Sequence, residues 1–256
     1  MKNFLGAKSI AATVLALAGV TVSAAETWTG HATLANGGAP AYNEIHYLLG
    51  DERLVVYTCP DGQPFARKTI SENSNAQAPD FSMLDARWGY REGVRGKDSS
   101  REIFVQRKPE MAEKSALLEL PKDGVIDAGF DAYVRKHWDA LARGDTLRFN
   151  FLVPSKRTFY AFDLSRIDSG SDATRLTLRL ALGAWYAFLT PHIDVTYDRA
   201  TRRLLRFAGM SNIRDENLKN LDVRIEFPQA PRPATQEQVA AASAEPLVNS
   251  CAGSGK

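Results

Sequence analysis

The sequence offers few side chains whose spacing suits chemistry. Its four histidines are His31, His46, His137 and His192, and no two lie three or four residues apart, the spacing that places two ligands on one helix face. It also has no His-Glu-x-x-His motif, no Gly-x-Ser-x-Gly elbow and no glycine loop that would cradle a phosphate. We therefore expect neither a metal nor a cofactor.

Glu44 and His46 are the titratable pair that we weigh most closely. They are two residues apart, so on a strand both side chains would point from the same face. With Asp85, which also lies on a strand-like run, they would supply the acid and base of a hydrolase. Such pairs are common on wet sheet faces, and a hydrolase is therefore an alternative interpretation. Contact between His46 and a carboxylate in a cleft would support it.

Aromatic side chains are concentrated between residues 149 and 188. The stretch 178–189 has no charge after Arg179 and carries three aromatic residues among alanines and a glycine. It predicts either a buried core element or the aromatic wall of a cavity for a lipid-like ligand. The predicted ligand-lining residues are Phe149, Phe151, Tyr160, Phe162, Trp185, Tyr186 and Phe188.

Strands must position most of these side chains. In 147–153, 176–180 and 223–227, apolar residues alternate with polar ones, which is typical of half-buried strands. Further strand-like runs cover 27–34, 42–49, 54–58, 67–71, 83–90, 102–106, 159–167, 193–197 and 204–208. Short turns rich in Gly, Pro and Asp separate them. We predict a mainly β fold, a curved antiparallel sheet that forms a half-barrel or open barrel.

One segment, 126–143, has the period of a helix instead. Its apolar residues recur at three-and-four spacing and the pattern ends at Gly144. We predict one amphipathic helix packed on the sheet, with Asp127 capping its start and His137 in a structural role.

The two ends differ in composition from the middle. Residues 1–25 combine Lys2 and Lys8 with an apolar stretch and small residues before a cut near Ala24 or Ala25, as in a signal peptide for export to the periplasm. Residues 26–228 are expected to form a single domain, and the Pro- and Ala-rich residues 229–256 a flexible tail. No later stretch is long enough to span a membrane.

Without residues 1–25 the chain has 30 basic and 30 acidic side chains, since only two lysines are lost. This balance disfavours nucleic-acid binding. Three states are possible for the two cysteines, Cys59 and Cys251: an intramolecular disulfide, two free thiols, or a disulfide between chains. The sequence leaves these alternatives open.

The segment 196–215 carries a family resemblance. Its Thr196-Tyr197-Asp198 turn, its Arg-Arg-Leu-Leu-Arg-Phe run at 202–207 and its Gly-Met-Ser-Asn-Ile-Arg-Asp run at 209–215 resemble exported bacterial proteins of the DUF3108 family. More remotely, the chain is similar to the half-barrel carriers of lipoproteins. The resemblance implies a periplasmic half-barrel with an apolar interior, and it offers no known catalytic residues to carry over to this chain.

Three functions are therefore compared. The favoured one is a non-enzymatic periplasmic protein that holds a hydrophobic or lipid-like ligand in the concavity of its sheet. The alternatives are a hydrolase that acts on an envelope component and a structural protein that joins an envelope assembly through its tail or a strand edge.

Overall fold

The computed structural model describes residues 25–71, 75–97, 100–183 and 192–252, and they build one large sheet. The strands are β1 (Ala25–Leu34), β2 (Pro40–Leu49), β3 (Glu52–Thr58), β4 (Pro64–Ser71), β5 (Asp80–Asp85), β6 (Tyr90–Lys97), β7 (Ser100–Gln106), β8 (Lys114–Glu119), β9 (Gly124–Val125), β10 (Leu147–Val153), β11 (Thr158–Arg166), β12 (Arg175–Leu182), β13 (Ile193–Asp198), β14 (Leu204–Arg214), β15 (Asn220–Glu226) and β16 (Arg232–Ala234). The helices are α1 (Gly129–Lys136), α2 (Trp138–Arg143) and α3 (Gln236–Ala244), and two 3₁₀ turns are η1 (Pro154–Lys156) and η2 (Asp168–Gly170).

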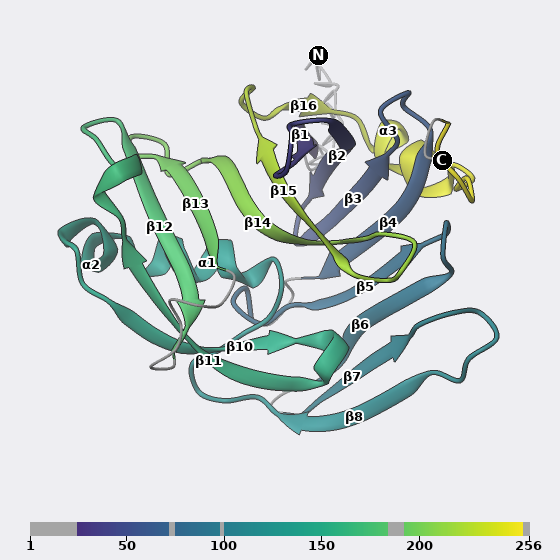
Figure 1. The fold of residues 1–256 in the computed structure, drawn as a ribbon, viewed down its shortest axis with the longest axis horizontal. Coiled ribbons are helices and arrows are strands. Elements are labelled where there is room, and N and C mark those ends of the chain that lie inside the picture. Colours follow the sequence, from purple (N-terminus) through teal and green to yellow (C-terminus); the bar gives the residue numbers. More distant parts are fainter. Residues whose placement is uncertain (1–24, 72–74, 98–99, 184–191, 253–256) are drawn as a thin grey trace, which may run out of the picture.

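The sheet consists of two meanders, β1–β8 and β9–β15, which join where β1 pairs with β15. Neighbouring strands are antiparallel except for β9, which runs parallel to β10. Figure 1 shows that the sheet curls, and its terminal strands β8 and β9 are not paired with each other among the described residues. The prediction of a curved antiparallel sheet with a helix packed on it is confirmed.

The predicted alternation produces the core of the second meander. Leu176 and Leu178 on β12 are completely buried, as is Leu164 on β11. Together with Phe149 they pack against Val134 and other buried side chains of α1 and α2. Complete burial of one such side chain contributes about 1.5–3 kcal/mol, so this face holds the helices on the sheet.

The first meander has its own core, and the hairpin β10–β11 closes over it. Leu152 is completely buried against this core and Phe159 packs beside it, although Phe149 on the opposite face of β10 belongs to the other core. The turn η1 at the tip of the hairpin lies against β6 and β7 (Figure 1). Both faces of this hairpin are therefore used in packing.

The predicted strand at 83–90 is wrong. β5 ends at Asp85, residues 86–89 form a turn, and β6 begins at Tyr90. The Asp85 carboxylate accepts a hydrogen bond from the Arg87 backbone N–H at 3.1 Å, which is the local geometry that favours a turn after Asp. Gly89 completes the turn with φ +63°, a conformation that costs glycine least.

The predicted single helix is divided into α1 and α2 at His137, whose φ of −103° and ψ of 17° are not helical. Gly144 ends α2 in the left-handed conformation, as the sequence indicates. The prediction that Asp127 caps the helix is wrong, because Ala128 is the N-cap and no side chain caps it.

The C-terminal segment is anchored to the sheet, which differs from the flexible tail that its composition predicts. β16 pairs with the start of β1, and Thr235 and Gln238 form a capping box at the start of α3. Arg67 donates to the backbone oxygens of Ala242 and Glu245 at 3.1 and 2.6 Å.

Cys251 and Cys59 then form a disulfide, with their Cα atoms 5.5 Å apart. The α3 helix buries no residue, so this segment is held by hydrogen bonds, by the covalent link and by Val248 and Cys251, which pack partly buried against the core of the first meander. This type of anchoring leaves little signal in the hydrophobic pattern. None of the helices in the described ranges is long and apolar enough to cross a membrane.

We expect reduction of the disulfide to release residues 235–251 to proteases while the melting temperature of the core changes by a few degrees at most. The link closes a loop with a sequence separation of 192 residues, for which chain entropy gives an upper limit of about 5 kcal/mol. The core should lose much less than this, because that figure assumes a rigid crosslink in the native state and the C-terminal segment adds little native structure. The released segment buries little surface, so its loss is a local opening and the core stays folded. Limited proteolysis and calorimetry with and without reductant measure both effects. A large drop in melting temperature would contradict the expectation.

Candidate functional site

The predicted ligand-lining residues fall into three groups. Phe149 is completely buried, and its ring lies 4.5 Å from that of Tyr133 and 6.2 Å from that of Phe130, both on α1. It therefore fills the space between helix and sheet. Trp185, Tyr186 and Phe188 lie outside the described residues.

Phe151, Phe162 and Tyr160 form the third group. They lie on the paired strands β10 and β11, next to the first turn of α1. The rings of Phe151 and Phe162 are 6.0 Å apart and both side chains are half-buried. Phe151 stands opposite Tyr160, which is 39% exposed, and Phe130 completes the group with its ring 6.3 Å from that of Phe151. We call Phe130, Phe151, Tyr160 and Phe162 the aromatic rim.

The aromatic rim is continuous with the second core but is not covered by it. Phe130, Phe151 and Phe162 pack on that core with part of their surface still accessible. Aromatic rings in contact that keep exposed surface are a common feature of binding sites for apolar ligands. Of the predicted residues that the structure describes, Phe151, Tyr160 and Phe162 are able to meet a ligand without rearrangement of the core, whereas Phe149 is not.

Glu44 and His46 do meet, as the hydrolase interpretation requires. His46 Nε2 lies 3.0 Å from Glu44 Oε1. The imidazole is stacked on Trp28 with ring centres 4.9 Å apart, and its centre is 5.9 Å from that of Phe227. Only 13% of the His46 side chain and 10% of the Glu44 side chain are exposed, so the pair is covered by aromatic rings.

Asp85 is engaged elsewhere. It is 1% exposed and accepts two hydrogen bonds from the Arg87 guanidinium, at 3.0 and 2.7 Å. Arg87 in turn lies 3.8 Å over the ring of Phe65. This ion pair holds the turn between β5 and β6. Glu44, His46 and Asp85 therefore do not offer an open acid–base site.

The polar residues that the sequence reasoning missed form a buried cluster around Asp127. Lys68 Nζ lies 3.0 Å from both carboxylate oxygens of Asp127, and the Asn212 amide donates to one of them at 2.8 Å. Burial alone would raise the pKa of Asp127, but the Lys68 ammonium and the hydrogen bonds outweigh it. The pKa of Asp127 is therefore below its ordinary value.

A second buried pair lies close to this cluster. Glu92 accepts a hydrogen bond from the Tyr90 hydroxyl at 2.6 Å and faces the Arg214 guanidinium at 3.6 Å. Burial raises the pKa of Glu92, and the nearby Asp127 carboxylate adds to this, while Arg214 and Tyr90 oppose it. Each buried charge in the two groups has an opposite charge beside it, which is the arrangement of a structural network.

No motif distinguishes Lys68 or Glu92 in the sequence, because charged residues in an alternating pattern normally face solvent. Asp127 was predicted only as a helix cap. Asn212 and Arg214 are the exception, since both lie in the run 209–215 that carries the family resemblance. Among the described residues no group of His, Cys, Asp and Glu is arranged to hold a metal ion.

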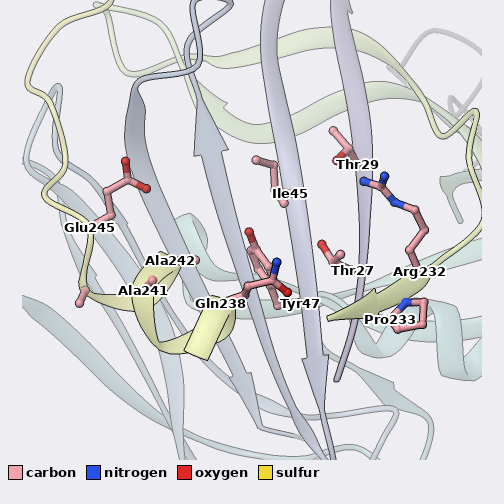
Figure 2. A pocket seen from close by; sticks show the side chains of 11 residues that line it. Thr27, Thr29, Ile45, Tyr47, Arg232, Pro233, Gln238, Ala241, Ala242 and Glu245 are labelled. Carbon is pink, nitrogen blue, oxygen red and sulfur yellow. The ribbon is translucent and has the colours of Figure 1, made fainter. Parts of the chain in front are cut away.

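The structure also contains a groove of about 910 Å³ between α3 and the strands β1 and β2. Figure 2 shows Arg232 of β16 on one side and Glu245, after the helix, on the other, with Tyr47 between them. Thr27 and Thr29 supply hydroxyl groups along the strand. Burial raises the pKa of Tyr47, and the Glu245 carboxylate contributes. The groove is thus open and lined by both polar and apolar side chains, unlike the aromatic rim.

Comparison with known proteins finds no family model that matches this chain and no similar curated protein.

We expect Asp127→Asn to destabilise the protein by about 3–5 kcal/mol at pH 7, because it leaves the Lys68 charge buried without its counterion. The carboxylate contributes its stability above the unfolded pKa of about 3.9 and loses it as the pH falls through its lower folded value. The difference between wild type and variant should therefore shrink towards pH 2. Urea unfolding at pH 7 and pH 2.5, monitored by tryptophan fluorescence, measures this difference in the free energy of unfolding.

Asp163→Asn is the matched control. Asp163 pairs with Arg148 at 2.8 Å, but the two side chains are 33% and 64% exposed. Loss of such a surface pair should cost less than about 1 kcal/mol. Equal effects of the two substitutions, or a difference for Asp127→Asn that is independent of pH, would show that the buried cluster does not stabilise the fold.

Proposed function

We propose that this protein is an exported, non-enzymatic binding protein of the cell envelope, and that an apolar or lipid-like ligand binds at its aromatic rim. The observation that carries the proposal is the contact between the partly exposed rings of Phe130, Phe151 and Phe162, from α1, β10 and β11, with the exposed Tyr160 opposite Phe151. These elements are fixed by a well-packed core, so the site is preformed.

The proposed binding site is smaller than the one that the sequence suggests, which was the whole concave face of the sheet. The concave face of the first meander is filled by its own core and by Leu152 and Phe159 of the hairpin β10–β11. The same interior also holds the buried, paired charges of Lys68, Asp127 and Glu92, so it is neither empty nor wholly apolar. A ligand at the aromatic rim avoids both obstacles.

A binding role also agrees with the fact that the candidate acid and base residues are covered or already paired. The Glu44–His46 pair is covered by Trp28 and Phe227, and Asp85 is held by Arg87. Export to the periplasm and the resemblance to the DUF3108 family and to lipoprotein carriers stay predictions. Both are consistent with a ligand that is poorly soluble in water.

The proposal is tested with the apolar fluorescent probe N-phenyl-1-naphthylamine and with native mass spectrometry of protein purified from a cell envelope. We expect the probe to bind with increased fluorescence and the purified protein to carry lipid-like mass. Tyr160→Lys should weaken the probe's affinity about tenfold or more, because it places a charge beside Phe151 and removes one aromatic face. Tyr160 is exposed, so the substitution should leave the fold intact.

Met210→Lys is the control for an added charge on an exposed apolar side chain, because Met210 is 47% exposed and lies on β14. It should leave probe binding unchanged. The proposal fails if wild-type protein binds no probe and carries no lipid, or if the two substitutions weaken binding equally.

A further inference from the structure

A small pocket lies between the tip of the hairpin β10–β11 and the loop that joins β7 to β8. Its volume is about 230 Å³, below the range of about 300–1,000 Å³ that is typical of sites for drug-sized molecules. Arg107, Lys114 and Arg157 line it, and Ser155 adds a hydroxyl group. No Asp or Glu is among the described residues that line it. The pocket therefore suits a small group with negative charge.

The three cations have no counter-ion of their own. Among the residues that the structure describes, no carboxylate lies within ion-pair distance of Arg107, Lys114 or Arg157. Glu113, next to Lys114 in the sequence, is paired with Arg95 at 3.2 Å. Arg157 is only half-exposed, so its charge is less well screened by water than that of an open surface residue. A bound anion would offset the repulsion between these charges.

Both walls of the pocket are held in place by the fold. The Gln106 side chain donates to the backbone oxygens of Pro109 and Met111, at 3.2 and 2.9 Å, and so shapes the loop after β7. On the other wall, the Arg157 backbone N–H donates to the Pro154 oxygen at 2.8 Å and ends η1, which lies against β6 and β7. The φ of Arg157 is +52°, which is uncommon for a residue with a side chain. A preformed site of this kind loses little entropy when a ligand binds.

We propose that this pocket binds a phosphate group, carried either by a small soluble ester or by a lipid headgroup. A phosphate monoester has a charge of about −1.5 to −2 at pH 7 and three strong acceptor oxygens. Two guanidinium groups supply forked donors, Lys114 a point charge and Ser155 a hydroxyl donor. A carboxylate has one charge and two oxygens, so it would leave part of this set of donors unused. None of these residues belongs to the aromatic rim, and the site is independent of the function proposed above.

Isothermal titration calorimetry with glycerol phosphate tests the site directly. At a salt concentration of about 0.15 M, we expect the wild type to bind it with a Kd below about 1 mM. Glycerate, which carries a carboxylate in place of the phosphate, should bind about tenfold more weakly or less tightly still, because it has less charge and fewer acceptor oxygens.

Two substitutions remove one cation each from the pocket. Arg157→Asn should weaken the affinity for glycerol phosphate about tenfold or more, and Asn tolerates the left-handed backbone at this position. Lys114→Gln should weaken it in the same direction, and Lys114 is exposed, so this variant keeps the fold. Arg175→Gln is the matched control, because it removes an exposed arginine at the start of β12 that does not line the pocket. It should leave the affinity unchanged.

Vesicles of phosphatidylcholine with and without phosphatidic acid identify the source of the phosphate. Association with the phosphatidic acid vesicles that Arg157→Asn weakens indicates a lipid headgroup, and binding of glycerol phosphate without such association indicates a soluble ester. The proposal is overturned if the wild type binds neither, if the two pocket substitutions weaken binding no more than Arg175→Gln, or if glycerate binds as tightly as glycerol phosphate. Binding of N-phenyl-1-naphthylamine should not respond to Arg157→Asn, so the two proposals fail separately.

Discussion

Asp127 is the point at which three separate parts of the chain are held together. Its carboxylate accepts hydrogen bonds from Lys68 of β4 in the first meander and from Asn212 of β14 in the second, and the residue itself lies two positions before the start of α1. Its backbone has a φ of +44°, which is uncommon for a residue with a side chain, although Asp tolerates it better than most. A buried carboxylate of this kind requires its partners, and so the helices, β4 and β14 have one relative arrangement.

The rest of the fold has more local causes. Most strands pair with the next strand in sequence, so turns and alternation determine the register of each meander. The sequence was therefore sufficient to predict the curved antiparallel sheet and most of its strands. It was insufficient where a local side chain changed the path, as Asp85 does in the turn after β5, and where the helical period continued through the break at His137.

In the candidate site too, the local pattern predicts some features, and others depend on distant parts of the chain. Alternation places Phe149, Phe151 and Phe162 on one face, and they do lie together, but the pattern does not reveal that α1 covers Phe149 and leaves Phe151 and Phe162 partly exposed. The burial of Lys68 and Glu92, and the ion pair of Asp127, were missed because burial of a charge depends on partners from distant strands. The anchoring of the C-terminal segment depends on Arg67 and the disulfide, which an analysis of hydrophobicity ignores.

The join between the two meanders has a consequence for the order in which the chain is able to fold. β1 pairs with β15 at His31–Glu226 and with β16 at Ala25–Ala234, so one side of the first described strand is completed by the last ones. A chain that emerges from a ribosome or a translocation pore with its N-terminus first can form the hairpins β1–β8 early. β1 then keeps a vacant side until β15 has emerged, which begins about 100 residues after the end of β8. During that interval, β1 and β8 both present free edges, and the nascent chain depends on rapid emergence or on a chaperone to keep them apart from other strands.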